Sequence, residues 1–257
     1  MKQKIKKWIL RAGCTAVLVL SLLVVIVLKP SLLYANKTEF GNCSIYHNKA
    51  LDPLFTQRLE KAIQITKASE LYEPDVHIDV CVDDGSYYPM LIRVILGEAF
   101  GRGFYNKLVL YGAMDCKNNR LSLRGYNWNM EQLCAHEIVH LLQYKKYGLF
   151  GSPPLSRRPS WKWEGYPEYV ARQSASQKDL QQNISRMLKA QQSERDGWIN
   201  FEDSTGTIIP YYEAWVLCQY CIDVKKMSFA QLLNDNRDKE TVNAEMMTWY
   251  YTNLTCR

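Results

Sequence analysis

The first strong pattern along the chain is an apolar stretch close to the N-terminus. Residues 12–28 are seventeen positions without a charge, rich in Leu and Val. As a helix they span about 25 Å, close to the thickness of the hydrocarbon layer of a membrane. The basic residues that precede this stretch are Lys2, Lys4, Lys6, Lys7 and Arg11. The pattern predicts a cytoplasmic basic segment (residues 1–11), a transmembrane signal-anchor (12–29) and an external body.

A cleaved signal peptide is the alternative interpretation of the same stretch. Cleavage after Ala35 would place Leu33 at the third position before the cut, where a small residue is expected. This mismatch favours an uncleaved anchor, in a single-pass protein of the cell membrane whose C-terminal domain is extracytoplasmic. Cleavage would instead make the protein secreted.

Beyond the anchor, the pattern predicts strands first and helices afterwards. We expect residues 30–50 to be a juxtamembrane linker and residues 51–257 to form one domain with a sizeable core. Residues 76–82 alternate between apolar and polar, as a half-buried strand does. The other predicted strands are 107–111 and 120–123, and the predicted helices are 51–71, 89–100, 177–192, 211–224 and 227–233. This order predicts an α+β fold with a small N-terminal β-sheet and a mainly helical C-terminal part.

The distribution of charge excludes one class of partner. The whole chain has a net charge of +6, and residues 1–30 hold six basic residues and no acidic one. Residues 31–257 are therefore balanced, with 26 basic and 26 acidic residues. Because the excess of positive charge belongs to the membrane segment, we expect no nucleic-acid partner.

The motif His136-Glu137-Ile138-Val139-His140 carries the candidate chemistry. Two histidines four residues apart lie on the same face of a helix and can bind one metal ion. Glu137 can reach a water held on that metal, which is the position that a general base needs. The alternative is a buried helix whose histidines only form hydrogen bonds within the core.

Local signals place this motif on a helix. Asn129 precedes it as a candidate N-cap, and Gln132 stands three residues later, as in a capping box. Gly148 offers a stop after the last turn. The histidines are therefore expected on one helix face.

A third metal ligand can come from the segment 161–170, which reads Trp-Lys-Trp-Glu-Gly-Tyr-Pro-Glu-Tyr-Val. Glu164 and Glu168 follow His140 by twenty-four and twenty-eight residues. A catalytic zinc usually has three protein ligands and one open position. Together with the histidine motif, this segment resembles the gluzincin branch of the zincin metallopeptidases. The resemblance covers about residues 76–236, and its specific motifs lie between 130 and 170.

The resemblance implies a zincin-like fold and one Zn²⁺ per chain, held by His136, His140 and Glu164. It also implies that Glu168 hydrogen-bonds His136, which fixes the tautomer of that ligand. The alternative is that Glu168 is itself the third ligand.

Pro167 departs from the family pattern, in which a small residue is usual at this position. Proline is tolerated in the first turn of a helix but not in its interior. We therefore expect the second helix to begin near Trp163 or Glu164.

Residues 209–217, Ile-Pro-Tyr-Tyr-Glu-Ala-Trp-Val-Leu, resemble the Tyr-rich helix start found in several gluzincin families. The resemblance implies that Tyr211 donates a hydrogen bond to the oxyanion of the tetrahedral intermediate. Tyr212 is the alternative donor, and simple packing is the alternative role for both. Elsewhere, Cys134 is expected to be a buried thiol, and Cys218 with Cys221 is expected to be neither a redox nor a zinc motif.

These observations predict a membrane-anchored, extracytoplasmic zinc metallopeptidase, a hydrolase that acts on a peptide or protein substrate. It would hydrolyse peptide bonds through a zinc-activated water, with Glu137 as the general base. The alternative is a zincin-like domain that binds zinc and regulates without turnover. The glutamate between the histidines favours the enzyme, because a binding module has no need for a base there.

Overall fold

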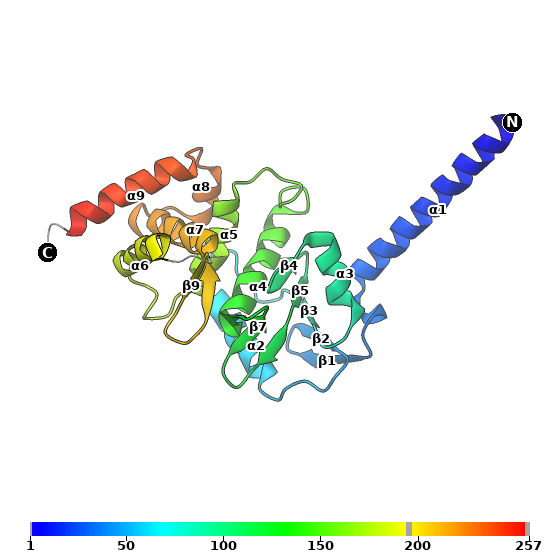
Figure 1. The fold of residues 1–257 in the computed structure, drawn as a ribbon, viewed down its shortest axis with the longest axis horizontal. Helices are drawn as coiled ribbons and strands as arrows, with labels where there is room; N and C mark the ends of the chain where they lie inside the picture. Colours follow the sequence, from blue (N-terminus) through cyan, green and yellow to red (C-terminus); the bar gives the residue numbers. More distant parts are fainter. Residues whose placement is uncertain (1, 194–196, 255–257) are drawn as a thin grey trace.

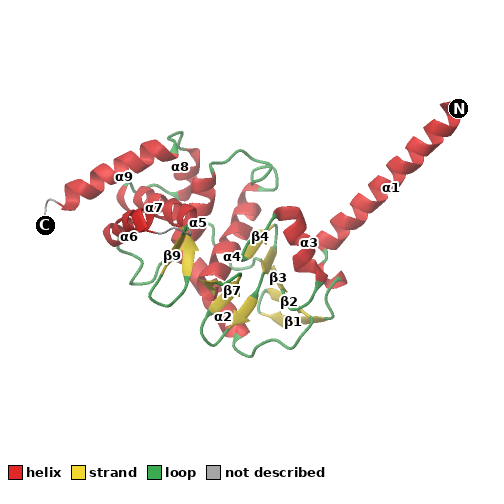
Figure 2. Cartoon of the chain, viewed as in Figure 1, coloured by secondary structure: helices red, strands yellow, loops and turns green. Residues whose placement is uncertain are grey.

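The body has a half that contains the main sheet and a half that is mainly helical, and helix α4 lies between them (Figure 1). The computed structural model describes residues 2–193 and 197–254. Figure 1 shows the strands β1–β5 on one side of α4 and the helices α5–α9 on the other. Figure 2 shows that helices α2 and α3 accompany the strands β1–β5, that β9 lies among the helices on the other side, and that α1 projects from the strand-rich half. The fold is therefore mixed α+β, with one N-terminal apolar helix and a small sheet.

The main sheet has five strands in the order β1-β2-β3-β5-β4. Its strands are β1 (Asn36–Phe40), β2 (Cys43–His47), β3 (Ile78–Val82), β4 (Gly101–Phe104) and β5 (Lys107–Leu110). The three central strands, β2, β3 and β5, are parallel, and the two edge strands are antiparallel to their neighbours. Strand β4 therefore forms one free edge of this sheet.

Two smaller sheets complete the strands. A three-stranded antiparallel sheet consists of β6 (Ala113–Asp115), β7 (Arg120–Leu123) and β8 (Tyr126–Asn129). A hairpin consists of β9 (Trp198–Asn200) and β10 (Gly206–Ile208). Strand β8 runs directly into α4, and β10 runs directly into α7. Both small sheets thus lead into helices that border the site described below.

The helices of the body are α2 (Phe55–Thr66), α3 (Tyr87–Leu96), α4 (Met130–Tyr147), α5 (Ser160–Ala171), α6 (Leu180–Ser193), α7 (Ile209–Gln219), α8 (Phe229–Asn234) and α9 (Lys239–Leu254). Helix α4 contributes to both hydrophobic cores. Leu133, Ile138 and Leu141 pack into the core of the sheet half, whereas Val139 packs into the core of the helical half. Because α4 is covered on both sides, its polar residues must find partners inside the protein.

Helix α1 (Lys2–Leu28) projects away from the body (Figure 1). It contains one stretch, Lys6–Leu28, that is long and apolar enough to cross a membrane. A signal sequence has the same length and composition near an N-terminus, so both interpretations of this stretch stay open.

The prediction that residues 30–50 form a linker is wrong, because this segment is part of the main sheet. This segment contributes β1 and β2, and every residue of β2 is buried between β1 and β3. Strand β1 carries Lys37 and Glu39 on an exposed edge, and β2 is only five residues long. Neither strand shows enough periodicity to be recognised alone.

Three further predictions need correction. Residues 76–82 were expected to form a half-buried strand, but all of β3 is buried because it lies in the middle of the sheet. Strands were expected first and helices afterwards, but the β9–β10 hairpin lies among the C-terminal helices, which remain the main elements of that part. The helix that contains Glu164 begins at Ser160 rather than near Trp163, so Pro167 lies in its interior. The predicted helices 51–71 and 89–100 correspond to α2 and α3 with shorter bounds.

Candidate metal centre

Helix α4 presents His136, Glu137 and His140 to one cleft. Its N-terminus is capped as predicted, because the Asn129 side chain accepts a hydrogen bond from the Gln132 N–H, and Gly148 ends it with a positive φ. All three motif residues are buried. They line a cleft of about 350 Å³ that β4 and α5 also border. The cleft therefore gives access to the motif residues of α4.

Three candidate ligand atoms converge in this cleft. His140 Nε2 lies 3.1 Å from His136 Nε2 and 3.1 Å from Glu164 Oε2. His136 Nε2 lies 3.5 Å from the same Glu164 oxygen. Ligand atoms about 2.0–2.1 Å from a tetrahedral zinc are about 3.3 Å from one another. The three atoms therefore fit three corners around one metal ion.

Glu137 lies next to both histidines of this set. Its carboxylate is within 4.8 Å of both imidazoles, so His136, Glu137 and His140 form a buried group that could hold a metal ion. Its Oε2 accepts a hydrogen bond of 2.5 Å from the Gly103 N–H of β4. A Cβ on Gly103 would lie 2.2 Å from the carbonyl oxygen of Glu137, so only glycine lets β4 approach α4 this closely.

The outer nitrogen of each histidine is held by another side chain. His140 Nδ1 lies 2.7 Å from Gln143 Oε1, and the Gln143 amide donates to the carbonyl oxygen of Trp163 at 3.1 Å. Trp163 is four residues before Pro167, so its carbonyl lacks the helical N–H that proline cannot supply. Gln143 replaces that missing donor. This contact is the physical reason why Pro167 is tolerated inside α5.

His136 is held from α5. Its Nδ1 lies 3.1 Å from Glu168 Oε1, and the other Glu168 oxygen accepts from Arg172 Nε at 2.5 Å. Arg172 also donates to Gln132 Oε1. The Gln132 side chain thus accepts from Arg172 and donates to Gln177. It does not complete the capping box that the sequence indicated.

Sequence reasoning missed Arg172 altogether. This arginine is 2% exposed and sits among the rings of Trp128, Phe201 and Trp215, with its guanidinium carbon 4.9–5.9 Å from their centroids. Its position one turn after Glu168 was the available signal, since such pairs interact on a helix. A buried charge is stable only with a partner of opposite charge, and Glu168 supplies it.

The ionisation of these groups follows from their mutual contacts. Burial lowers the pKa of His136, but hydrogen bonds with Glu164 and Glu168 outweigh it and raise that pKa to about 10. Burial opposes ionisation of Glu164, yet His140 and His136 hold its pKa well below the usual range. Burial likewise opposes ionisation of Glu168, while Arg172 and His136 keep its pKa low. Both carboxylates are therefore charged at neutral pH, as metal ligation and histidine orientation require.

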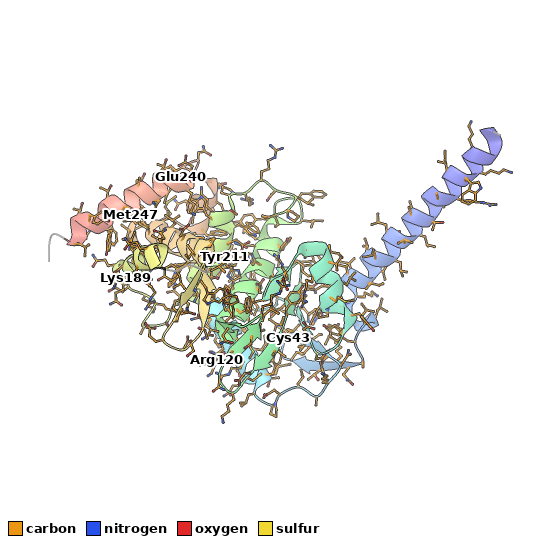
Figure 3. The ribbon with its side chains drawn as sticks, in the orientation of Figure 1. Cys43, Arg120, Lys189, Tyr211, Glu240 and Met247 are labelled. Carbon is orange, nitrogen blue, oxygen red and sulfur yellow. The ribbon has the colours of Figure 1, made fainter. Side chains whose placement is uncertain are left out.

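Tyr211 lies at the wall of the same cleft. Figure 3 places it in the middle of the body, and its ring stacks on His136 with centroids 5.9 Å apart. The Glu164 carboxylate, burial and Glu137 raise the pKa of Tyr211, so its hydroxyl stays protonated. Among the residues that the structure describes, none forms a hydrogen bond with this hydroxyl. Tyr212 instead points into the helical core and donates to the carbonyl oxygen of Asn183.

Compared with known proteins, the sequence matches no protein-family model and no curated protein. The site is therefore interpreted from its own residues.

Among the described residues, no cysteine lines this cleft. Cys134 is a buried free thiol on α4, as predicted, and burial raises its pKa. Cys218 and Cys221 are also buried free thiols within the helical half. The described wall of the cleft therefore offers nitrogen and oxygen atoms as candidate ligands.

Proposed function

We propose that the protein is a gluzincin-type zinc metallopeptidase, anchored by α1 with its body outside the cell. The observation that carries this proposal is the convergence of His136, His140 and Glu164 at tetrahedral spacing beside an open cleft. Two imidazoles and one carboxylate, with a fourth position open to solvent, are the ligand set of catalytic zinc. Glu168 then orients His136 rather than binding the metal, because Arg172 occupies its second oxygen.

A zinc ion at these three atoms would supply Lewis acidity to a water and to the substrate carbonyl. The rest of the chemistry belongs to the chain itself. Glu137 Oε2 is held by Gly103, which leaves Oε1 to take a proton from the attacking water. Glu137 then delivers that proton to the leaving amine. Tyr211 donates its free hydroxyl to the oxyanion of the intermediate.

The shape of the cleft supports a peptide as the substrate. Strand β4 is one of the two edge strands of the main sheet, and Gly101, Arg102 and Gly103 line the cleft beside Glu137. An exposed strand edge binds an extended peptide through main-chain hydrogen bonds. A small-molecule substrate would not need such an edge.

The test is removal and return of the metal. The full chain should cleave members of a peptide library, lose cleavage when a chelator removes its metal, and regain it when zinc is added back. A zinc-loaded chain that cleaves no peptide would leave the alternative, a zinc-binding domain without turnover.

A further inference from the structure

Helix α3 is apolar on both of its faces. Tyr88 and Ile92 pack against the main sheet, while Tyr87, Met90, Val94 and Ile95 are exposed, Val94 to 80%. Arg93 is the only charged residue in this helix. A surface helix of a globular protein normally turns a polar face to water. The outer face of α3 therefore requires an apolar environment other than the protein core.

A second apolar surface lies in the loop between α4 and α5. Leu149, Phe150 and Leu155 are exposed there, Phe150 to 85%. The loop is fixed to α4, because the Tyr144 hydroxyl donates to the carbonyl oxygen of Pro153 at 2.6 Å. These exposed apolar side chains therefore belong to a loop that is held against α4.

Both surfaces border the same cleft. Ile95 and Leu96 of α3 line it from one side, and Pro153 and Pro154 of the loop line it from another. The two segments, 87–96 and 148–159, together contain three arginines and no acidic residue. Arg93 pairs with Asp83 and Arg158 lies over the ring of Tyr147, which leaves Arg157 as the exposed arginine of these segments. The exposed surface of the two segments is therefore mainly apolar.

The end of α1 is attached beside α3. The Tyr88 hydroxyl donates to the carbonyl oxygen of Val27 at 2.7 Å, and the Ser86 hydroxyl donates to that of Leu33 at 2.8 Å. Val27 and Leu33 pack against the cluster that contains Tyr88. Figure 1 shows α1 leaving the body next to α3. A membrane crossed by α1 would thus begin at the level of α3.

We propose that the exposed apolar residues of α3 and of the 148–159 loop rest on the outer face of the bilayer that α1 crosses. Apolar side chains would enter the boundary between headgroups and acyl chains, and the exposed Arg157 would meet anionic headgroups. The cleft then opens beside the membrane surface. This inference rests on the anchoring and peptidase activity proposed above, and it names the substrate class: polypeptides that are themselves attached to the membrane and are cleaved close to it.

The first experiment tests the surface without using activity. The full chain is inserted into vesicles of phosphatidylcholine and phosphatidylglycerol, with p-benzoylphenylalanine replacing Val94, Phe150 or, as the control, Tyr251. Tyr251 is also exposed but lies on α9, at the far end of the body from α1 (Figure 1). Illumination should join lipid to positions 94 and 150 and not to 251.

Two results would overturn the proposal. One is a lipid adduct at 94 and 150 no greater than at 251, and the other is an adduct with a second copy of the chain instead of lipid. Glu137→Gln should give the same lipid adducts as the parent, because contact with lipid does not depend on catalysis. The membrane proposal can therefore be tested even if the peptidase proposal fails.

The second experiment tests the substrate class. Val94→Asp combined with Phe150→Asp should slow cleavage of a lipid-anchored peptide several-fold while the same peptide free in solution is cleaved as before, because neither residue lines the cleft. An equal effect on both peptides would contradict the inference. If the parent cleaves neither peptide although lipid adducts form, the peptidase proposal fails and the membrane surface stands.

Discussion

Helices α4 and α3 border the same cleft, but they meet their surroundings in opposite ways. Twelve of the eighteen residues of α4 are buried, and His136 and His140 each have a partner on the side away from the candidate metal position. Helix α3 packs through one face only, and its other face is apolar and exposed. In α4 the twelve buried side chains are constrained by protein neighbours, whereas the side chains on the outer face of α3 are exposed.

This difference separates two kinds of information in the chain. Residues on the buried helix determine what the site can bind, because each polar group needs a defined partner. Exposed residues of α3 are proposed to determine where the site lies relative to the membrane. They need an apolar environment, such as the lipid surface, rather than contact with one particular atom. Substitutions on or against α4 are therefore expected to have large effects, and substitutions on the outer face of α3 small ones in water.

The largest expected effect is on metal binding through α5. Glu164→Ala should abolish stoichiometric zinc, because it removes one of three ligands. Glu168→Ala should weaken zinc only about 10–100-fold, since it removes the partner of a ligand. Zinc content after dialysis and competition with a chromogenic chelator measure both. Full zinc in Glu164→Ala with loss in Glu168→Ala would reverse the ligand assignment.

Arg172 should show the effect of a buried charge left alone. Arg172→Met keeps much of the volume but leaves Glu168 buried without its cation, which should reduce the free energy of unfolding by about 3–5 kcal/mol. Lys145→Met is the control, because Lys145 pairs with Glu73 where both side chains are half exposed. That change should be below about 1 kcal/mol. Urea unfolding of the two variants compares them, and equal stability would refute the role given to Arg172.

Tyr211 should affect the rate without affecting the metal. Tyr211→Phe removes the free hydroxyl and should lower kcat/KM by about 10–10³-fold, with zinc content unchanged. Tyr212→Phe should leave kcat/KM unchanged, because that hydroxyl faces the helical core. Kinetics with one peptide substrate test both. If Tyr212→Phe lowers kcat/KM and Tyr211→Phe does not, Tyr212 and not Tyr211 is the donor to the oxyanion.

The smallest expected effect lies on α3. Val94→Ser in detergent solution should change the free energy of unfolding by no more than about 0.5 kcal/mol. Val139→Ser makes the same change at a fully buried position of α4 and should cost about 1–3 kcal/mol, because it also buries a hydroxyl. Similar losses in the two variants would remove the contrast between the helices.

The sequence predicted the parts of the site that depend on local signals. The bounds of α4 follow from Asn129 and Gly148, and the spacing of His136 and His140 follows from the helix period. The structure also brings Glu164 and Tyr211, which the sequence could only suggest through a family resemblance, to the same cleft as the histidines. It places Glu168, suggested in the same way, against the outer nitrogen of His136.

What the sequence did not predict depends on contacts between distant segments. The start of α5 was misplaced because the donor that satisfies the carbonyl of Trp163 comes from Gln143 on another helix. Arg172 was missed because the rings that surround it come from β8, the loop after β9, and α7. Strands β1 and β2 are too short to be recognised without the neighbour that pairs with them.

The central claim, that Glu137 is the base of a zinc peptidase, is tested most directly by measuring bound zinc and peptide cleavage together in the parent and in Glu137→Gln. Glutamine keeps the shape and an acceptor oxygen but cannot take the proton. We expect one zinc per chain in both proteins and a cleavage rate about 10²–10⁴-fold lower in the variant. Cleavage by Glu137→Gln as fast as by the parent, with zinc equally bound, would contradict this claim.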